Sequence, residues 1–258
     1  MNSKQNLKKN NYGIGQKNKS RNVGEQREMF LPPDDIRYTI YSSKIWRKFL
    51  NQLQNINSRI VDFGCGRGTT LYCLEKLGFK KLHGVDLYKS IPKHFLRETK
   101  FKVGDVTKSK YNENYFDGLV SSMVIEHVDD RLFSKEIYRV LKPGGIALIT
   151  SVLKNKFAVY FYKNDKGEMV IEPSHLREYN NIQDFVNIFS KYFEVLLVEK
   201  KALCYPVIDP FFRLLYKLTK KQILRDLPTR HSMLKALRKI RFPIPGYFSV
   251  EILLKKLK

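Results

Sequence analysis

The segment VDFGCGRGTT, residues 61–70, determines how the rest of this chain is interpreted. It completes the short β-branched run RIVDF (59–63) and leads into TTLYCLEKLG (69–78), a helix-like stretch that ends at a glycine. Glycine is favoured where the backbone must adopt a positive φ or where a ligand approaches closely. The turn has three glycines on alternate positions: Gly64, Gly66 and Gly68. The segment therefore predicts a strand, a ligand-binding turn and a helix N-terminus.

Strands and helices alternate on both sides of this turn. Helical spacing marks residues 38–53 and the stretch 129–145, which Pro143 and two glycines end. Four further strand-like runs are KLHGVDL (81–87), FKVGDV (101–106), FDGLVSS (116–122) and IALITSV (146–152). This alternation predicts an α/β fold, with a parallel sheet covered by helices on both faces.

The pattern changes after residue 152. Residues 157–173 carry a hairpin signal around Asn-Asp-Lys-Gly, and 175–190 begin as a loop and become a helix. Residues 193–203 and 246–256 read as strands. Between these two strands, the basic stretch 209–242 has the spacing of two amphipathic helices.

Acidic and hydroxyl side chains fall where the predicted strands end. Parallel sheets bind ligands outside the carboxyl ends of their strands, so these side chains are expected to converge on one crevice. A dinucleotide fingerprint needs glycine at its sixth position, where this chain has Thr69, so a nicotinamide or flavin cofactor is disfavoured. The converging residues are Asp62, Asp86, Asp105, Ser121 and Ser122.

Five ordered motifs resemble one family. VDFGCGRGTT, GVDL, GDV, FDGLVSSMVIEHVDD and RVLKPGGIALIT are similar to the class I S-adenosylmethionine-dependent methyltransferases, in the type-11-like branch that acts on small molecules. The resemblance implies a Rossmann-like doubly wound sheet of about seven strands, mostly parallel with an antiparallel last strand. It also implies that the hairpin and the helical insertions form a substrate cap.

The expected organisation is one methyltransferase domain, residues 31–258, preceded by a flexible basic tail, residues 1–30. Within the domain, residues 58–152 are the cofactor-binding core. Residues 153–192 form a substrate-side insertion, and 204–245 form a basic helical insertion between the last two strands.

The resemblance also assigns roles around S-adenosylmethionine. Asp62 is expected near the methionine ammonium, and Asp86 is expected to accept both ribose hydroxyls, which suits a carboxylate with two oxygens. The adenine is expected beside Leu87, Asp105 and Val106. The remaining predicted cofactor contacts, against the amino-acid moiety, ribose and methyl group, are Gly64, Cys65, Gly66 and Ser121.

Two histidines are candidate general bases, each with a competing structural interpretation. His127 follows the fourth strand, and its alternative role is to bond a neighbouring loop. His175 opens the predicted substrate pocket, with Arg177 and Tyr179 as predicted substrate contacts. Arg37 and Tyr38 are positioned to close over the cofactor carboxylate. No metal site is expected.

Charge limits the partners. The net charge is +23, and residues 200–258 hold 15 Lys/Arg against three Asp/Glu. A basic surface favours anionic lipid, nucleic acid or phosphorylated substrates. Three scattered cysteines suggest a reducing compartment, and no apolar run is long enough for a transmembrane segment. We therefore expect a cytoplasmic protein, with peripheral attachment to the inner face of the membrane as one option.

The favoured function is O-methylation of a small-molecule, sugar or lipid-linked acceptor. The region after the fourth strand reads SSMVIEH, which lacks the Asn/Asp-Pro-Pro-aromatic tetrad of amide and exocyclic-amine methyltransferases and the cysteine of cytosine C5 enzymes. Two alternatives stay open: an RNA methyltransferase that uses the basic termini, and a non-catalytic cofactor-binding protein.

Overall fold

The computed structural model describes residues 43–257, apart from 54, 89–98, 159–161, 173, 220, 222, 225–226 and 228–230. The predicted tail (1–30), the candidate residues Arg37 and Tyr38, and the start of the predicted first helix (38–42) lie outside the described residues.

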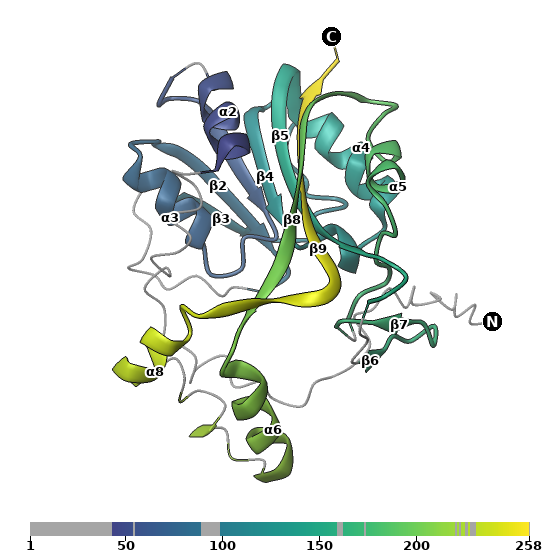
Figure 1. Ribbon diagram of the computed structural model, residues 1–258. Coiled ribbons are helices and arrows are strands. Elements are labelled where there is room, and N and C mark those ends of the chain that lie inside the picture. The colour runs from purple at the N-terminus through teal and green to yellow at the C-terminus, as the bar shows by residue number, and fades with distance from the viewer. Residues whose placement is uncertain are drawn as a thin grey trace, which may run out of the picture.

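One seven-stranded sheet organises the described chain, in the order β3-β2-β1-β4-β5-β9-β8 (Figure 1). All neighbouring pairs from β3 to β5 are parallel, whereas β9 runs antiparallel to both β5 and β8. The predicted sheet, mostly parallel with an antiparallel last strand, is confirmed. The strands are β1 (Arg59–Phe63), β2 (Lys81–Asp86), β3 (Thr99–Val103), β4 (Phe116–Ser122), β5 (Leu141–Lys154), β8 (Phe193–Pro206) and β9 (Arg241–Lys256).

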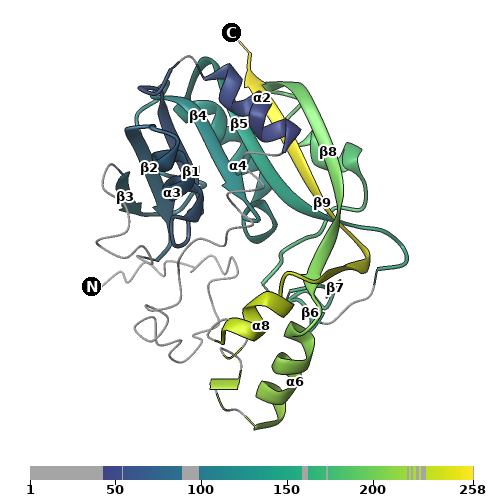
Figure 2. The ribbon, with the colours of Figure 1, turned by 60° about the vertical axis from the view of Figure 1, so that its left-hand side comes forward.

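Helices cover both faces of the sheet (Figure 2). Helices α2 (Lys44–Gln52) and α3 (Thr69–Lys76) pack on one face, and α4 (Asp130–Val140) and α5 (Ile182–Asn187) pack on the other. Successive strand residues point to opposite faces. Ile60 of β1 accordingly packs with Phe49 of α2, whereas Val61 packs in the core that holds Phe133 of α4.

Several predicted boundaries differ from the structure: β8 extends to Pro206, β9 begins at Arg241, and two further differences lie in the predicted cofactor-binding core. The third strand is Thr99–Val103 instead of 101–106, so Asp105 and Val106 lie in the turn after it. Helix α4 ends at Val140, and β5 begins at the next residue. Pro143 has no N–H and disfavours helical backbone at the residue before it, so the predicted helix over 129–145 ends earlier than expected.

Beyond the parallel sheet, β8 and β9 continue as a two-stranded ribbon. Lys154, the last residue of β5, pairs with Tyr247, but β8 and β9 remain paired as far as Pro206 and Arg241. The ribbon carries α6 (Asp209–Thr219) and α8 (Ser232–Leu237) away from the sheet (Figures 1 and 2). We call residues 200–249 the arm. Because β8 is parallel to β5, the arm leaves from the edge where the parallel strands end.

A short hairpin and a 3-10 turn complete the same edge. Strands β6 (Tyr162–Lys163) and β7 (Met169–Val170) form the predicted hairpin, and the turn η2 (Ile125–His127) follows β4. The carboxyl edge of the sheet therefore brings together the glycine loop, η2, the segment after the hairpin and the base of the arm.

Candidate active site

The glycine loop is fixed on one side and open on the other. The backbone N–H groups of Gly64 and Cys65 both donate to the carbonyl of Val85 on β2, at 2.8 and 3.1 Å. Gly64 has a φ of 75°, and a Cβ there would overlap the side chain of Val124. Gly66 has a φ of 50°, and a Cβ there would meet no atom within 4 Å. The open side at Gly66 is where a ligand can approach the backbone.

Asp86 anchors this loop from the end of β2. One carboxylate oxygen accepts the N–H of Gly66 at 2.8 Å, and the other accepts the N–H of Tyr88 at 3.2 Å. Each oxygen retains a further lone pair, so the carboxylate can also accept two ligand hydroxyls. Leu87 follows it with 46% of its surface exposed, a position that suits a flat apolar ring.

A second carboxyl lies below the loop. Asp62 is only 3% exposed, and burial, together with the negative charge of Asp86, raises its pKa to about 8. Two carboxyls that repel each other beside an open loop favour a ligand that brings positive charge. The two carboxyl groups beside the open loop therefore fit S-adenosylmethionine, which carries an ammonium and a sulfonium group.

The other predicted cofactor residues differ in their exposure to solvent. Asp105 is exposed, and one of its oxygens accepts the N–H and O–H of Thr107 at 2.8 and 2.7 Å, so it forms a turn of its own. Val106 and Cys65 are buried beside the loop. Ser121 is 1% exposed and donates to the carbonyl of Phe63 at 2.7 Å. Ser121 therefore supports the end of β1 and does not line an open crevice. Contact of these residues with the cofactor stays a prediction.

The two candidate histidines lie side by side. Their ring centroids are 4.8 Å apart, in an edge-to-face arrangement. Nδ1 of His127 is 3.1 Å from the carbonyl of Ser174. A carbonyl can only accept, so Nδ1 of His127 carries the proton in this contact. This bond to a neighbouring loop is the structural role weighed for His127.

His175 belongs to a buried hydrogen-bonded network. Its Nδ1 is 2.7 Å from Oε1 of Glu178, which also accepts the N–H of Ile171 at 2.8 Å. Oε2 of Glu178 accepts the hydroxyl of Tyr247 at 3.1 Å, at the base of the arm. Burial acts to raise the pKa of Glu178, but the hydrogen bonds from His175 and Ile171 outweigh it and hold the pKa below its usual range.

A second buried glutamate, Glu126, has the opposite electrostatic character. It is 0% exposed, and its Oε1 accepts the hydroxyl of Ser151 at 2.9 Å and the N–H of Val152 at 3.1 Å. Its Oε2 has no hydrogen-bond partner among the described residues. Burial raises the pKa of Glu126 despite these bonds. Glu126, whose pKa is raised, and Glu178, whose pKa is lowered, thus flank the two histidines.

The predicted substrate contacts have structural partners. The guanidinium of Arg177 donates to the carbonyl of Val128 at 3.0 Å and pairs with Asp130 at 2.9 Å. Tyr179 is 6% exposed, and its ring packs on Phe185 at 5.1 Å. The geometry therefore gives no support to a substrate role for Arg177 or Tyr179: both residues attach the segment after the hairpin to the core.

Sequence reasoning missed Glu126, Glu178 and Tyr247. The only local signal was the spacing of His175 and Glu178 by three residues. Nothing in the segment that holds Glu126 predicts that Ser151 of β5 covers its carboxyl group.

Comparisons with known proteins show similarity in sequence and in fold. A family model described as a methyltransferase domain matches residues 61–149. Phosphoethanolamine N-methyltransferase 3 of Arabidopsis thaliana is 31% identical over 41% of this chain and 24% of its own length. The ubiquinone/menaquinone biosynthesis C-methyltransferase UbiE of Rickettsia bellii is 26% identical over 62% of this chain and 73% of its own. A solved structure of geranyl diphosphate methyltransferase in complex with S-adenosylmethionine superposes with a TM-score of 0.53 at 14% identity, covering 82% of this chain and 84% of that one.

The fold, the glycine loop and the match over residues 61–149 together define a class I methyltransferase domain. Residues 61–149 are therefore those of an S-adenosylmethionine-dependent methyltransferase domain, and S-adenosylmethionine is the cofactor of this domain. The chain spans about a quarter of the length of the plant relative, so the methyl acceptor of that relative cannot be assigned to this chain.

Proposed function

We propose that the protein transfers a methyl group from S-adenosylmethionine to a hydroxyl oxygen of a small, lipid-linked acceptor, with His175 as the general base. The buried Glu178–His175 pair, at the same carboxyl edge of the sheet as the glycine loop, carries this proposal. Relatives named as N- and C-methyltransferases leave the acceptor atom open, and the pair favours an acceptor that must lose a proton.

The residues divide the work of the reaction. Bound S-adenosylmethionine supplies an electrophilic methyl group on a positively charged sulfur. Asp86 would hold the ribose, and Asp62 would balance the positive charge of the cofactor. Because Glu178 is anionic, His175 carries its proton on Nδ1 and presents Nε2 as the base. Nε2 would take the proton of the acceptor hydroxyl, whose oxygen would accept the methyl group and leave S-adenosylhomocysteine as the second product. Glu178 then stabilises the imidazolium.

A steady-state assay of two variants tests this role. His175→Gln and Glu178→Gln are each expected to lower kcat by about 10²–10⁴-fold, the usual size of general-base catalysis, with unchanged affinity for S-adenosylhomocysteine. Lys135→Gln, an exposed site on α4, is the control. A wild-type kcat in His175→Gln would show that His175 is not the general base. A folded wild type that binds no S-adenosylhomocysteine would refute cofactor use.

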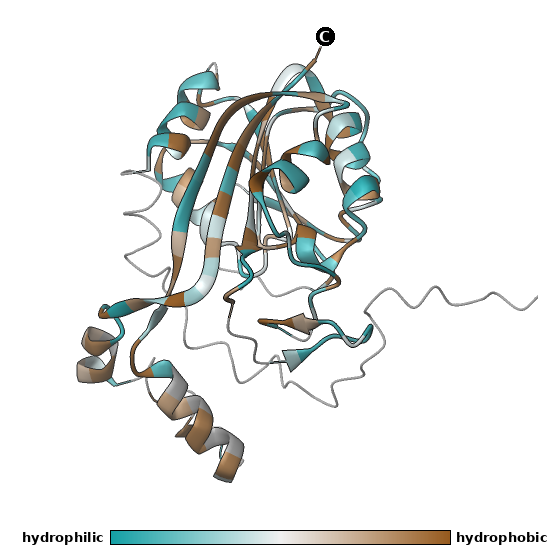
Figure 3. Cartoon of the chain, turned by 45° about the vertical axis from the view of Figure 1, so that its right-hand side comes forward, coloured by the Kyte–Doolittle hydropathy of each residue, from teal (hydrophilic) through white to brown (hydrophobic). Residues whose placement is uncertain are grey.

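The arm favours an acceptor held in a membrane. Apolar side chains stand in solvent on α6 and beyond α8, among them Leu218 at 71% exposed, and Figure 3 shows the hydrophobic colouring of the helices of the arm. Arg238 pairs with Asp209 through two bonds of 2.8 and 3.0 Å, which fixes the end of α8 to the start of α6. The most exposed apolar residues of the arm are Phe211, Leu214, Leu218, Ile223, Met233 and Ile240.

Charge complementarity selects an anionic bilayer as the partner of this apolar surface. Exposed basic residues border it, including Lys221, Lys239 and Arg241. Exposed apolar side chains with flanking cations are typical of elements that lie in a membrane interface. No helix in the described part of the chain is long and apolar enough to cross a membrane. We therefore propose peripheral binding, and a cytoplasmic location at the inner face stays part of this proposal.

Co-sedimentation with vesicles tests the arm. The wild type is expected to bind phosphatidylglycerol vesicles at low salt, and phosphatidylcholine vesicles much less. The triple variant Phe211→Ser, Leu214→Ser and Leu218→Ser should release it. Labelled methyl groups from S-adenosylmethionine should enter the organic phase of a bacterial lipid extract. Incorporation into RNA instead, without vesicle binding, would favour the RNA methyltransferase alternative.

A further inference from the structure

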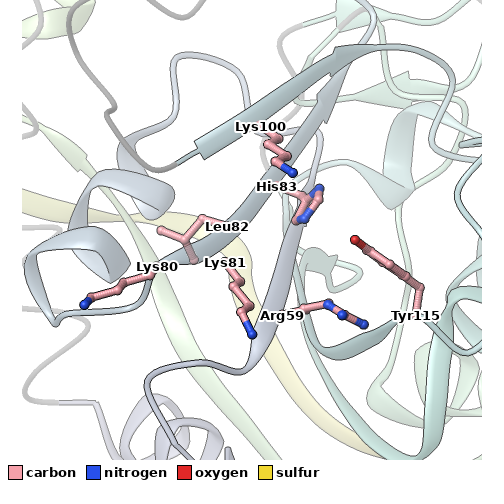
Figure 4. Close-up of a pocket in the computed structure, with 7 residues that line it drawn as sticks. All are labelled: Arg59, Lys80, Lys81, Leu82, His83, Lys100 and Tyr115. Carbon is pink, nitrogen blue, oxygen red and sulfur yellow. The ribbon is translucent and has the colours of Figure 1, made fainter.

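A cavity of ≈ 340 Å³ opens at the amino ends of β1, β2 and β3, opposite the cofactor edge (Figure 4). Strand β2 joins the two edges: it begins at Lys81, which lines the cavity, and ends at Asp86. At about 3.3 Å per residue, these two positions lie about 16 Å apart along the strand. The cavity is therefore separate from the site that binds the cofactor. Its lining residues are Arg59, Lys80, Lys81, Leu82, His83, Lys100 and Tyr115.

Positive charge dominates this cavity. Four of its seven lining residues are lysine or arginine, and none is acidic. The carboxylate of Asp117 accepts the backbone N–H of Arg59 at 2.7 Å and pairs through its other oxygen with Lys142. Within the described residues, no ion pair joins the side chains of Arg59, Lys81 or Lys100 to a carboxylate.

Aromatic rings pack against two of the lining side chains, His83 and the cationic Arg59. The guanidinium of Arg59 lies over the ring of Tyr115, 4.6 Å from its centroid. The imidazole of His83 packs edge-on against Tyr115 and Phe116, with centroids 5.7 and 5.1 Å apart. Figure 4 shows Tyr115 facing His83 and Lys100 across the cavity, with Arg59 beneath it. A stacked guanidinium loses little further freedom when it binds, and its planar fork matches a phosphate.

His83 is a buried, titratable group among these charges. It is 7% exposed, and burial, then the charges of Lys100 and Arg59, lower its pKa to about 4. The imidazole is therefore neutral at neutral pH and can donate one hydrogen bond to an anion without adding a charge that must be desolvated.

We propose that this cavity, the amino-edge site, binds the phosphate group of a small phosphorylated molecule. Its volume lies at the lower end of the range for small-molecule pockets, about 300–1,000 Å³, and the Tyr115 ring offers a flat wall for the rest of the ligand. The proposal does not depend on the acceptor or on methyl transfer.

Calorimetric titration at low salt with inorganic phosphate and with adenosine 5′-monophosphate tests the proposal. Both are expected to bind, and the monophosphate more tightly. Arg59→Lys, which keeps the charge but loses the fork, should weaken binding by about ten-fold, the difference expected for one charge-assisted bond. Lys100→Gln should also weaken binding, whereas Lys135→Gln should not.

Nuclear magnetic resonance of the His83 ring shows whether the anion is in this cavity. A bound phosphate must raise the pKa of His83, since it offsets the charges of Lys100 and Arg59. Absence of binding, equal weakening by Lys135→Gln, or binding without a shift at His83 would each overturn the proposal. Tight binding of a single-stranded RNA with no binding of the monophosphate would overturn it in favour of a nucleic-acid surface.

Discussion

Strands β1 and β2 begin and end in opposite electrostatic surroundings. Their carboxyl ends carry Asp62 and Asp86, and the negative charge of Asp86 helps to raise the pKa of Asp62 to about 8. At their amino ends, Lys100 and Arg59 help to lower the pKa of His83 to about 4. The carboxyl edge of the sheet thus favours a cationic ligand, and the amino edge favours an anionic one. The two edges lie one strand length apart, so a single sheet can offer sites of opposite charge preference.

Removing the charge of Asp86 should have the largest effect on this comparison. Asp86→Ala removes the acceptor of the Gly66 N–H and both acceptors for the ribose hydroxyls. Each charge-assisted bond contributes about 1.5–3 kcal/mol, so affinity for S-adenosylhomocysteine should fall by at least about 100-fold in calorimetric titration.

The matched control is Asp117→Asn, which neutralises a carboxylate at the opposite edge, where Asp117 accepts the N–H of Arg59. Cofactor affinity should stay at the wild-type value in this variant. An equal loss in both variants would show that total charge, and not the position of Asp86, governs binding.

The acidic edge also predicts a dependence on pH. With a pKa of about 8, Asp62 is mostly protonated at neutral pH in the free protein, and a cationic ligand favours its ionised form. Binding of S-adenosylmethionine at neutral pH should therefore release a proton, and affinity should rise by up to about ten-fold per pH unit between about pH 6 and about pH 7.5.

Titrations in buffers of different ionisation enthalpy measure this proton directly. Asp62→Asn cannot ionise, so it should show neither the proton release nor the rise of affinity with pH. If Asp62→Asn keeps the wild-type proton release, another group releases the proton.

The stability of the folded protein should change with pH in the opposite direction to the cofactor affinity. The folded state holds the Asp62 proton more tightly than the unfolded state, so Asp62 lowers wild-type stability as pH rises from about 4 to about 8.

The sheet and the cofactor edge were predictable because their signals are local. The segment RIVDF before the glycine loop gave β1 with its observed ends, and FDGLVSS gave β4. Asp86 was predicted at the end of the second strand, on the same edge as the glycine loop, and in the structure it accepts the Gly66 N–H at 2.8 Å. The requirement for glycine at positive φ and the alternation of strand faces both act within a few residues, so a short segment of sequence is enough to recognise them.

The acceptor side was not predictable in the same way, because its partners come from distant segments. His175 was identified, but the contact between Glu178 and Tyr247 joins residues 69 positions apart. Arg177 and Tyr179 looked available for substrate because their partners, Asp130 and Phe185, approach only in the folded chain. The amino-edge site likewise combines Arg59 of β1, Lys100 of β3 and Tyr115, which precedes β4, and no single segment predicts it.

The smallest expected effect is a change in the pKa of His83 at the amino edge. This change reports the electrostatic potential at that edge in the absence of a ligand. Lys100 is exposed, so water screens its charge, and Lys100→Gln should raise the pKa of His83 by only about half a unit or less. Added salt should raise this pKa in the wild type in the same direction and should have less effect in the variant. Lys135→Gln should leave it unchanged. If the pKa of His83 responds to neither Lys100→Gln nor salt, burial alone sets it, and the positive field that distinguishes the amino edge from the carboxyl edge is weaker than the cluster of side chains implies.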